Sequence, residues 1–396
     1  MTGPTTGPPL FEAREPARPR RLAGSLGRPW VRSLRIPVAL YAASRVATFA
    51  AVRFVSALRG GRAATRILTS WDGHWYVRIA AMGYPDHIPT HHGKAVFSEI
   101  PFFPLYPVMV RALDTVTPFD VRTTAIVLAV VLGAVAAAAL WLVTRRLFDE
   151  ATATRAVALL CFAPGAWVFT FAYSEGLMLL LSVATLWLLH ERRWLAAGIV
   201  GALGTASRPN AVVLAACAVW AAAVAIRRDR DWRSLVAVAL TPIGTLGFLG
   251  YLWIHTGEGD AWFRVQREAW GEHVDWGKST LHIMRVFVSY PLQSPDDLVI
   301  GLSTVLAVVM CCLLVRARLP GVFVVYTAGI LGLAATSAVL LPRPRFVLVA
   351  FPLVIATARF VRGRRLALLL AVTGGLMVIL VVWYGYSWGP LAPIPP

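Results

Sequence analysis

Apolar stretches long enough to cross a lipid bilayer recur along this 396-residue sequence, from Leu34 to Trp383. Each holds roughly 17–22 residues, and a helix of about 20 apolar residues spans the hydrocarbon core, which is about 30 Å thick. Hydrophobic residues make up 58% of the chain and charged residues only 15%, which excludes a soluble globular domain and a disordered chain. The sequence therefore predicts an all-α polytopic integral membrane protein.

The apolar pattern predicts about eleven transmembrane segments. They cover approximately residues 34–56, 123–144, 154–172, 174–190, 194–206, 210–226, 234–254, 298–315, 320–341, 346–361 and 365–385. The fifth and sixth are short, and we expect either two spans or a broken, re-entrant pair that protein surrounds. Residues 34–385 should form one membrane-embedded domain, between a disordered basic tail (1–33) and a short C-terminal tail (386–396).

The formal net charge of +18 is concentrated in alternate loops. Arginine pairs mark one set of loops, as at Arg145-Arg146, Arg192-Arg193 and Arg227-Arg228. By the positive-inside rule these loops are cytoplasmic, together with the N-terminal tail, and the C-terminal tail faces out. The charge thus reports orientation in a plasma membrane and argues against nucleic acid as a partner.

Two segments on the predicted outer side, residues 57–122 and 255–297, are too long and polar to be simple connectors. Seven of the eight histidines lie in them. Transporters usually place their rare polar groups at mid-membrane, between broken helices. Polar residues gathered outside the membrane instead favour an extracytoplasmic active site, with interfacial helices in both outer loops.

The densest polar and aromatic patch runs from Ser70 to Ile79 and centres on Asp72. Ser70 could cap a helix that Gly83 ends, which would put Asp72 in the first turn, where the helix dipole favours a carboxylate. An ionised carboxylate at the water–lipid boundary is suited to accept a proton from a sugar hydroxyl. The alternative is a capping aspartate among interfacial aromatics. The neighbours proposed to line a substrate pocket are Trp71, His74, Trp75, Tyr76 and Arg78.

A proline-rich aromatic segment, Pro101 to Pro107, follows in the same loop. Its three prolines forbid a regular helix before Pro107. Phe103 and Tyr106 could wall a groove for a lipid chain, or could pack the loop against the membrane domain. Glu99, just before this segment, is a candidate second carboxylate near Asp72.

Polar residues also interrupt the outer ends of later apolar segments, at Tyr173-Ser174-Glu175, Ser207-Arg208-Pro209-Asn210 and Pro342-Arg343-Pro344-Arg345. Guanidinium groups bind phosphate through two parallel hydrogen bonds. We therefore expect Arg208, Arg343 and Arg345 to hold the phosphate of a lipid carrier, with Tyr173 and Glu175 in the pocket. The alternative for each arginine is snorkelling to lipid headgroups.

Other features of the outer loops are less specific. The spacing of His87, His91 and His92 matches no strong metal signature, so we predict no metal site and no cofactor. The second outer loop interleaves indoles with carboxylates, an arrangement that suits carbohydrate rings or an amphipathic interfacial helix equally well. The indoles are Trp262, Trp270 and Trp276.

Taken together, the motifs resemble the Pig-V-type mannosyltransferase family, the group that contains GPI mannosyltransferase II. The resemblance covers about residues 35–355 and rests on Trp71-Asp72-Gly73-His74-Trp75-Tyr76, Gly83-Tyr84-Pro85, Phe102-Phe103-Pro104-Leu105-Tyr106-Pro107 and the later polar turns. It implies a GT-C fold with Asp72 as the catalytic carboxylate. It also implies that Arg208 and Arg345 lie near the donor phosphate, with Glu175 supporting the pocket.

The expected activity is transfer of a hexose, mannose by this resemblance, from a polyprenyl-phosphate donor to an extracytoplasmic acceptor. Inversion at the anomeric carbon and independence of metal ions are expected, and the acceptor is a glycan, glycolipid or protein. One alternative is a transporter or flippase of lipid-linked sugars, which would need polar groups along a membrane path; Arg45 and Arg53 are the basic candidates. The other is an accessory membrane subunit whose outer loops bind a partner protein.

Overall fold

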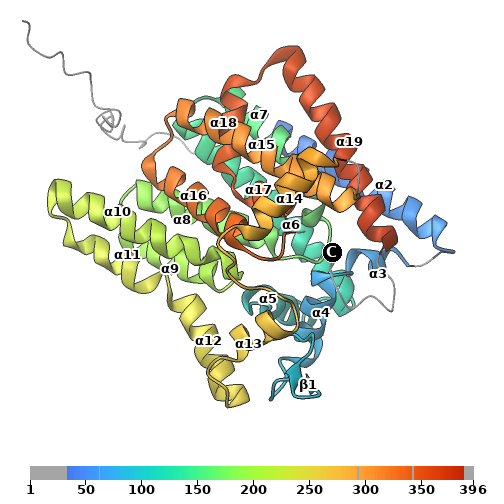
Figure 1. Cartoon of the computed structure of the whole chain (residues 1–396). Helices are drawn as coiled ribbons and strands as arrows, with labels where there is room; N and C mark the ends of the chain where they lie inside the picture. The colour runs from blue at the N-terminus through green and yellow to red at the C-terminus, as the bar shows by residue number, and fades with distance from the viewer. Residues whose placement is uncertain (1–33, 62, 292–293, 341–342, 388–396) are drawn as a thin grey trace, which may run out of the picture.

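A computed structural model describes residues 34–61, 63–291, 294–340 and 343–387, and within them the chain is almost entirely helical (Figure 1). Six helical segments are long and apolar enough to cross a membrane: Arg35–Leu58, Val121–Leu147, Pro209–Asp229, Trp232–Thr256, Pro295–Ala317 and Gly363–Ser387. Shorter apolar helices, such as Glu175–His190 and Gly321–Thr336, pack among them. These features confirm a polytopic helical membrane protein.

The first half of the described chain forms the first outer loop and the central helices. Its elements are α2 (Arg35–Leu58), α3 (Ala64–Leu68), α4 (Asp72–Met82), β1 (Thr90–His91), β2 (Lys94–Ala95), α5 (Leu105–Asp114), α6 (Val121–Leu147), α7 (Glu150–Cys161), the 3₁₀ helix η1 (Pro164–Phe169), α8 (Glu175–His190) and α9 (Trp194–Thr205). The short β1–β2 hairpin forms the one sheet among the described residues.

The second half adds the outer helices of the bundle and the second outer loop. Its elements are η2 (Pro209–Val212), α10 (Val213–Asp229), η3 (Trp232–Ser234), α11 (Leu235–Leu240), α12 (Ile243–Thr256), α13 (Ala261–Glu268), α14 (Lys278–Ser289), α15 (Pro295–Ala317), α16 (Gly321–Thr336), α17 (Arg343–Val349), α18 (Pro352–Phe360) and α19 (Gly363–Ser387). The last helix runs to Ser387, so it includes the first two residues of the predicted C-terminal tail. The rest of that tail and the predicted N-terminal tail (1–33) lie outside the described residues.

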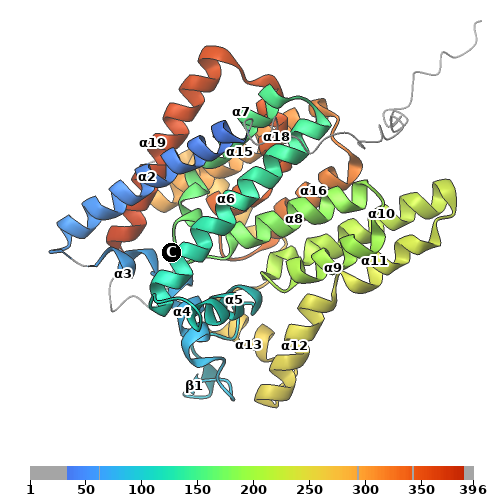
Figure 2. The same cartoon turned by 180° about the vertical axis from the view of Figure 1, so that it is seen from behind.

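All eleven predicted segments contain helix, but three of them are broken at proline. The 154–172 segment divides into α7 and η1 before Pro164, and the 346–361 segment into α17 and α18 before Pro352. The 234–254 segment divides at Pro242, where α11 ends and α12 begins. Proline lacks an N–H and clashes with the preceding turn, which explains each break. Beyond its break, α12 runs away from the main bundle towards α13 and the first outer loop (Figures 1 and 2).

Helix termini follow their local sequence. Asp120 and Asp149 accept hydrogen bonds from the amides of Thr123 and Thr152, so they cap α6 and α7. Close packing joins α6 to α8, because a Cβ atom added to Gly176 would lie only 2.9 Å from the backbone nitrogen of Gly133. The first turn of α8 is thereby held against the middle of the bundle.

Arg45, at the middle of α2, is buried and satisfied by the protein. Its guanidinium donates to the carbonyl oxygen of Ala166 at 2.7 Å and to the hydroxyl of Thr170 at 2.8 Å. The rings of Tyr41 and Phe169 lie over it. These bonds fix α2 to η1 just before the turn that leads into α8.

The segments predicted to face outward meet at one end of the bundle. The end of α19 lies beside the first outer loop: the Trp71 indole donates to the carbonyl oxygen of Tyr384 at 3.2 Å. The predicted inner loops meet at the opposite end, where Arg359 donates to Ala317 and Arg155 to Ala358. The alternation of loops inferred from charge is therefore consistent with the fold.

Candidate active site

Helix α4 of the first outer loop starts at the predicted catalytic residue. Asp72 is the first residue of α4, which Gly83 ends with a positive φ of 84°, as expected. The expected cap is wrong, because the Ser70 hydroxyl donates to the carbonyl oxygen of Ile67. Trp71 precedes the helix instead, with φ 55° and ψ −125°, a region that strains a side chain bearing a Cβ. Its indole bond to α19 holds this turn and so directs Asp72.

Four charged side chains from distant parts of the chain converge on this point. Arg345, from α17, donates through Nη1 to Asp72 Oδ2 at 2.6 Å and to Glu175 Oε1 at 3.3 Å. Arg208, from the turn before η2, lies 3.0 Å from Glu175 Oε2 and 3.8 Å from Asp72 Oδ2. We call Asp72, Glu175, Arg208 and Arg345 the charge cluster.

The charge cluster is enclosed and formally neutral. Exposed fractions are 10% for the Asp72 side chain, 2% for Glu175, 11% for Arg208 and 12% for Arg345. Two carboxylates balance two guanidiniums at a site where water screens poorly, so their mutual attraction is strong. The sequence predicts a carboxylate at the water–lipid boundary at residue 72, whereas in the structure this group is mostly buried and paired with Arg345.

Polar and aromatic groups next to the charge cluster hold its two arginines in place. Arg208 Nη1 donates to the Ser174 hydroxyl at 3.1 Å, and the Tyr76 hydroxyl lies 2.7 Å from the same oxygen. The Arg345 guanidinium stands over the Tyr173 ring at 5.3 Å. Burial raises the pKa of Tyr76 to about 12, so this group stays protonated and can donate. The sequence pattern assigns no separate role to Ser174, although this residue belongs to the Tyr173-Ser174-Glu175 motif.

Other predicted residues lie around α4 but outside the cluster. Glu99 is buried and forms an ion pair with Arg78 at 2.5 Å. Because Arg78 does not belong to the charge cluster, this pair lies outside it. Trp75 stacks on Phe102, and the exposed ring of His74 meets Trp75 edge-on. We call His74, Trp75 and Phe102 the shelf; these rings lie beside α4 on its outer side.

The proline-rich segment packs rather than opening a groove. Phe103 is 2% exposed and lies against Phe248, in a small apolar cluster beneath the outer loops. Tyr106 is fully buried and donates to the carbonyl oxygen of Ala125 at 2.6 Å. Both residues anchor α5, and neither has the exposure that a pocket wall requires. This helix begins at Leu105, two residues before the expected Pro107.

The third predicted arginine, Arg343, begins α17, but its side chain lies outside the described residues. Its expected contact with phosphate therefore stays a prediction.

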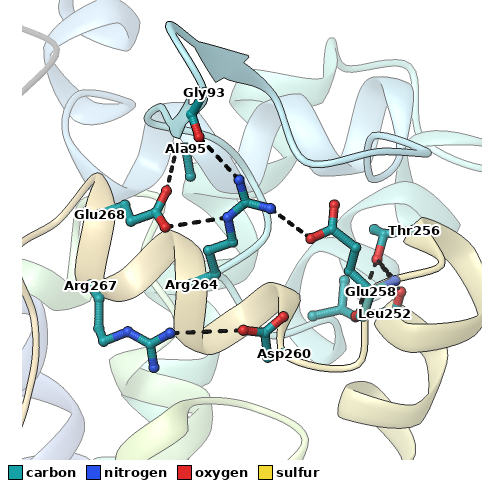
Figure 3. Close-up of polar contacts among 9 residues, drawn as sticks. All are labelled: Gly93, Ala95, Leu252, Thr256, Glu258, Asp260, Arg264, Arg267 and Glu268. Atoms are coloured by element: carbon teal, nitrogen blue, oxygen red, sulfur yellow. Dashed lines mark hydrogen bonds and ion pairs between the residues drawn. The ribbon is translucent and has the colours of Figure 1, made fainter.

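The two outer loops are fastened to each other. Arg264 of α13 contacts Glu258 and Glu268 at 2.8 and 3.3 Å and donates to the carbonyl oxygen of Gly93 in the β-hairpin (Figure 3). Glu268 also accepts the amide of Ala95 at 2.7 Å. The two loops therefore form a single outer layer above the shelf.

Two of the three indoles of the second loop belong to this layer. Trp262 donates to the carbonyl oxygen of Pro101, and Trp270 packs edge-on against Trp75 and Phe102. Trp276 is 84% exposed. Two indoles thus complete the outer layer, and the third is left available to lipid or solvent.

The histidines of the first outer loop make local contacts. His87 pairs with Asp86 at 2.6 Å, and the rings of His91 and His92 touch. Within the described ranges, no group of three or more histidine, cysteine, aspartate or glutamate residues is arranged to hold a metal ion.

One family model and two solved structures match parts of this chain. Residues 103–253 match a family model described as dolichyl-phosphate-mannose-protein mannosyltransferase. The structure resembles that of ArnT from Cupriavidus metallidurans bound to undecaprenyl phosphate, with TM-score 0.50 and 15% identity, over 74% of this chain and 56% of ArnT. The oligosaccharyltransferase from Archaeoglobus fulgidus, tethered to an acceptor peptide that contains the NVT sequon, gives TM-score 0.44 and 13% identity, over 81% and 51%. No curated protein matches the chain.

The fold is therefore of the same type as that of ArnT, the GT-C type expected from the sequence. The chain spans only about half the length of these solved relatives. The matching family model is not that of the Pig-V-type family, so the finer resemblance stays a prediction.

Proposed function

We propose that this protein is a membrane glycosyltransferase that moves a sugar from a polyprenyl-phosphate donor to an acceptor outside the cytoplasm. The single observation that carries the proposal is the convergence of Asp72, Glu175, Arg208 and Arg345 at the end of the bundle where the two long loops meet. The GT-C fold and the family-model match support the same class of chemistry.

In this proposal, Asp72 is the base and the two arginines bind the donor phosphate. The acceptor oxygen forms a bond to the anomeric carbon while the bond from that carbon to the phosphate oxygen breaks. The proton of the acceptor hydroxyl passes to Asp72, and the electron pair of the broken bond leaves with the phosphate. The products are the glycoside and the polyprenyl phosphate, with inversion at the anomeric carbon because attack comes from the opposite face.

The leaving phosphate needs positive charge rather than a proton. Arg208 and Arg345 can supply it from an enclosed site, where such charge stabilises the transition state more than it would in water. The scheme therefore requires no metal ion. We propose mannose as the sugar, because the matching family model describes mannosyltransferases and the outer-loop motifs resemble the Pig-V-type family.

The proposed orientation puts the N-terminus in the cytoplasm and the charge cluster outside, in a plasma membrane. Its basis is the concentration of arginine in alternate loops. The acceptor, a glycan, glycolipid or protein, would then approach over the shelf of α4 and the outer layer.

A flippase or transporter of lipid-linked sugars is the weaker proposal. Arg45, the buried basic residue of the first span, already donates to carbonyl and hydroxyl oxygens of its own fold. It is thus committed to holding α2 against η1. A transport path would need such a group to be available to the passing phosphate.

The decisive experiment measures sugar transfer from radiolabelled polyprenyl-phosphate mannose by the purified protein in detergent. Asp72→Asn should lower the transfer rate by about 10²- to 10⁴-fold, the usual contribution of a general base. Glu99→Gln is the matched control, because Glu99 is also a buried carboxylate on the outer side but pairs with Arg78.

The pair of variants separates the assignments. Near-normal transfer by Asp72→Asn, or loss of transfer only in Glu99→Gln, would refute Asp72 as the base. Absence of transfer by the wild type, with flipping of the lipid in vesicles, would favour the transporter.

A further inference from the structure

The charge cluster poses a physical problem for the binding of any phosphate. Its four formal charges cancel, so the enclosed site offers an approaching anion no net positive charge. The guanidinium that should bind the phosphate is also the one engaged with Asp72, through the 2.6 Å contact of Nη1. A phosphate and the Asp72 carboxylate therefore compete for Arg345.

The two carboxylates of the cluster are held unequally. Glu175 contacts both arginines, at 3.0 and 3.3 Å, and its side chain is 2% exposed. Asp72 has one short contact, with Arg345, and lies 3.8 Å from Arg208. If Arg345 binds another anion instead, Glu175 still contacts Arg208, whereas Asp72 loses its one short contact with a cation.

Arg345 has hydrogen-bonding capacity in reserve. Both of its hydrogen bonds within the described chain use Nη1, so Nε and Nη2 are not engaged there. The Nε and Nη2 edge of a guanidinium can bind a phosphate through two parallel hydrogen bonds. A phosphate can thus begin to bind before the contact with Asp72 is broken.

We propose that the donor phosphate displaces Asp72 from Arg345, so that Asp72 becomes a free base only when the donor is bound. This inference rests on the proposed function and adds a control to it: the protein without donor keeps its base masked in an ion pair. Glu175 remains as the permanent counter-ion of the two arginines. Because coupling between two equilibria is reciprocal, removal of the Asp72 charge must strengthen the binding of phosphate.

The test measures binding of undecaprenyl phosphate, without any sugar, to the full chain in detergent micelles. Asp72→Asn should lower the Kd by about fivefold or more relative to the wild type, the lower end of usual coupling. Asp86→Asn removes an equal charge from an exposed site of the same loop and should leave the Kd unchanged. In the double variant Asp72→Asn with Arg345→Ala, the increase in affinity for undecaprenyl phosphate should disappear.

An unchanged or higher Kd for Asp72→Asn would overturn the proposal. An equal gain in Asp86→Asn would overturn it as well, because the effect would then be general electrostatics. If Asp72→Asn does not fold alone, saturating undecaprenyl phosphate should restore its thermal transition, since the phosphate replaces the missing anion. Failure of that rescue would contradict the exchange.

The outcomes also separate this inference from the proposed function. If Asp72→Asn binds undecaprenyl phosphate more tightly but the wild type transfers no sugar, the displacement of Asp72 by phosphate stands and the transferase function is refuted. If transfer depends on Asp72 but Asp72→Asn does not bind undecaprenyl phosphate more tightly, Asp72 remains the proposed base and the displacement by phosphate is refuted.

Discussion

At the scale of single residues, neighbouring carboxylates of the second outer loop differ in what surrounds them. Burial raises the pKa of Glu272, which accepts a hydrogen bond from Ser337 at 2.7 Å. The amide of Ala95 and the guanidinium of Arg264 lower the pKa of Glu268. Folding therefore favours the neutral form of Glu272 and the ionised form of Glu268.

The two residues should respond to pH with opposite signs. The Glu272 carboxylate costs stability as the pH rises from its unfolded pKa, about 4.3, through its higher folded pKa. Glu272→Gln should therefore raise the melting temperature at pH 8 and have little effect near pH 4. Glu268 stabilises the fold above about pH 4.3 and loses this effect as the pH falls. Glu268→Gln should lower the melting temperature at pH 8. Shifts of the same sign at pH 8 would contradict these assignments.

The sequence predicted the members of the charge cluster but not their pairing. Charged residues between apolar segments are conspicuous, and Asp72, Glu175, Arg208 and Arg345 could all be selected for that reason. Their contacts join residues as far apart as 273 positions, a separation that spacing along the chain cannot convey. Phe103 and Tyr106 show the converse, because an aromatic residue that packs and one that binds substrate look alike in a sequence.

At the scale of elements, the contact between α6 and α8 determines where Glu175 stands. Gly176 follows Glu175 directly and faces the backbone of Gly133 and Leu132, at 2.9–3.3 Å from the position of an added Cβ. A backbone neighbour cannot move aside as a flexible side chain can. If residue 176 carried a Cβ, the beginning of α8 would therefore have to shift, and Glu175 would move with it.

Gly176→Ala should destabilise the protein by about 1–3 kcal/mol, the usual cost of overpacking a tight contact. It should also reduce sugar transfer, because the cluster loses its geometry. Gly375→Ala, at a position of α19 with open space around it, is the control and should cost neither stability nor transfer. Thermal unfolding and the transfer assay measure both effects; an unaffected Gly176→Ala protein would show that α8 has room to move.

Breaks within helices were the part of the fold that hydrophobicity could not foresee. Apolar content is continuous across Pro164, Pro242 and Pro352, so each segment was predicted as one span. Beyond the first turn, the local chemistry of proline kinks or breaks a helix even where the surrounding residues are apolar. All eleven predicted segments nevertheless contain helix, and six helical segments are long and apolar enough to cross a membrane.

At the scale of the whole molecule, the two ends of the bundle carry different chemistry. The outer layer holds the carboxylates, indoles and histidines of the long loops, whereas the opposite end gathers arginines in short turns. The bundle is thus asymmetric across the membrane, which fits a protein that acts on one side.

Cysteine labelling in intact cells tests the orientation. Thr90→Cys lies in the exposed β-hairpin, and Arg228→Cys lies at the exposed end of α10. A membrane-impermeant maleimide should label Thr90→Cys directly and Arg228→Cys only after permeabilisation. The parent protein, with its four cysteines in apolar helices, provides the background. The opposite labelling pattern would reverse the proposed topology.

The separation of Asp72 from Arg345 has a consequence for biosynthesis. A ribosome that adds about 5–20 residues per second needs roughly 15–55 s to reach the arginine after it has made the aspartate. Throughout that interval the Asp72 carboxylate lacks the guanidinium that contacts it most closely, and Trp71 lacks the final helix that holds its turn. Completion of the protein therefore coincides with completion of its most polar interior, and a chain released early would expose an acidic group that the insertion machinery and quality-control proteases could recognise.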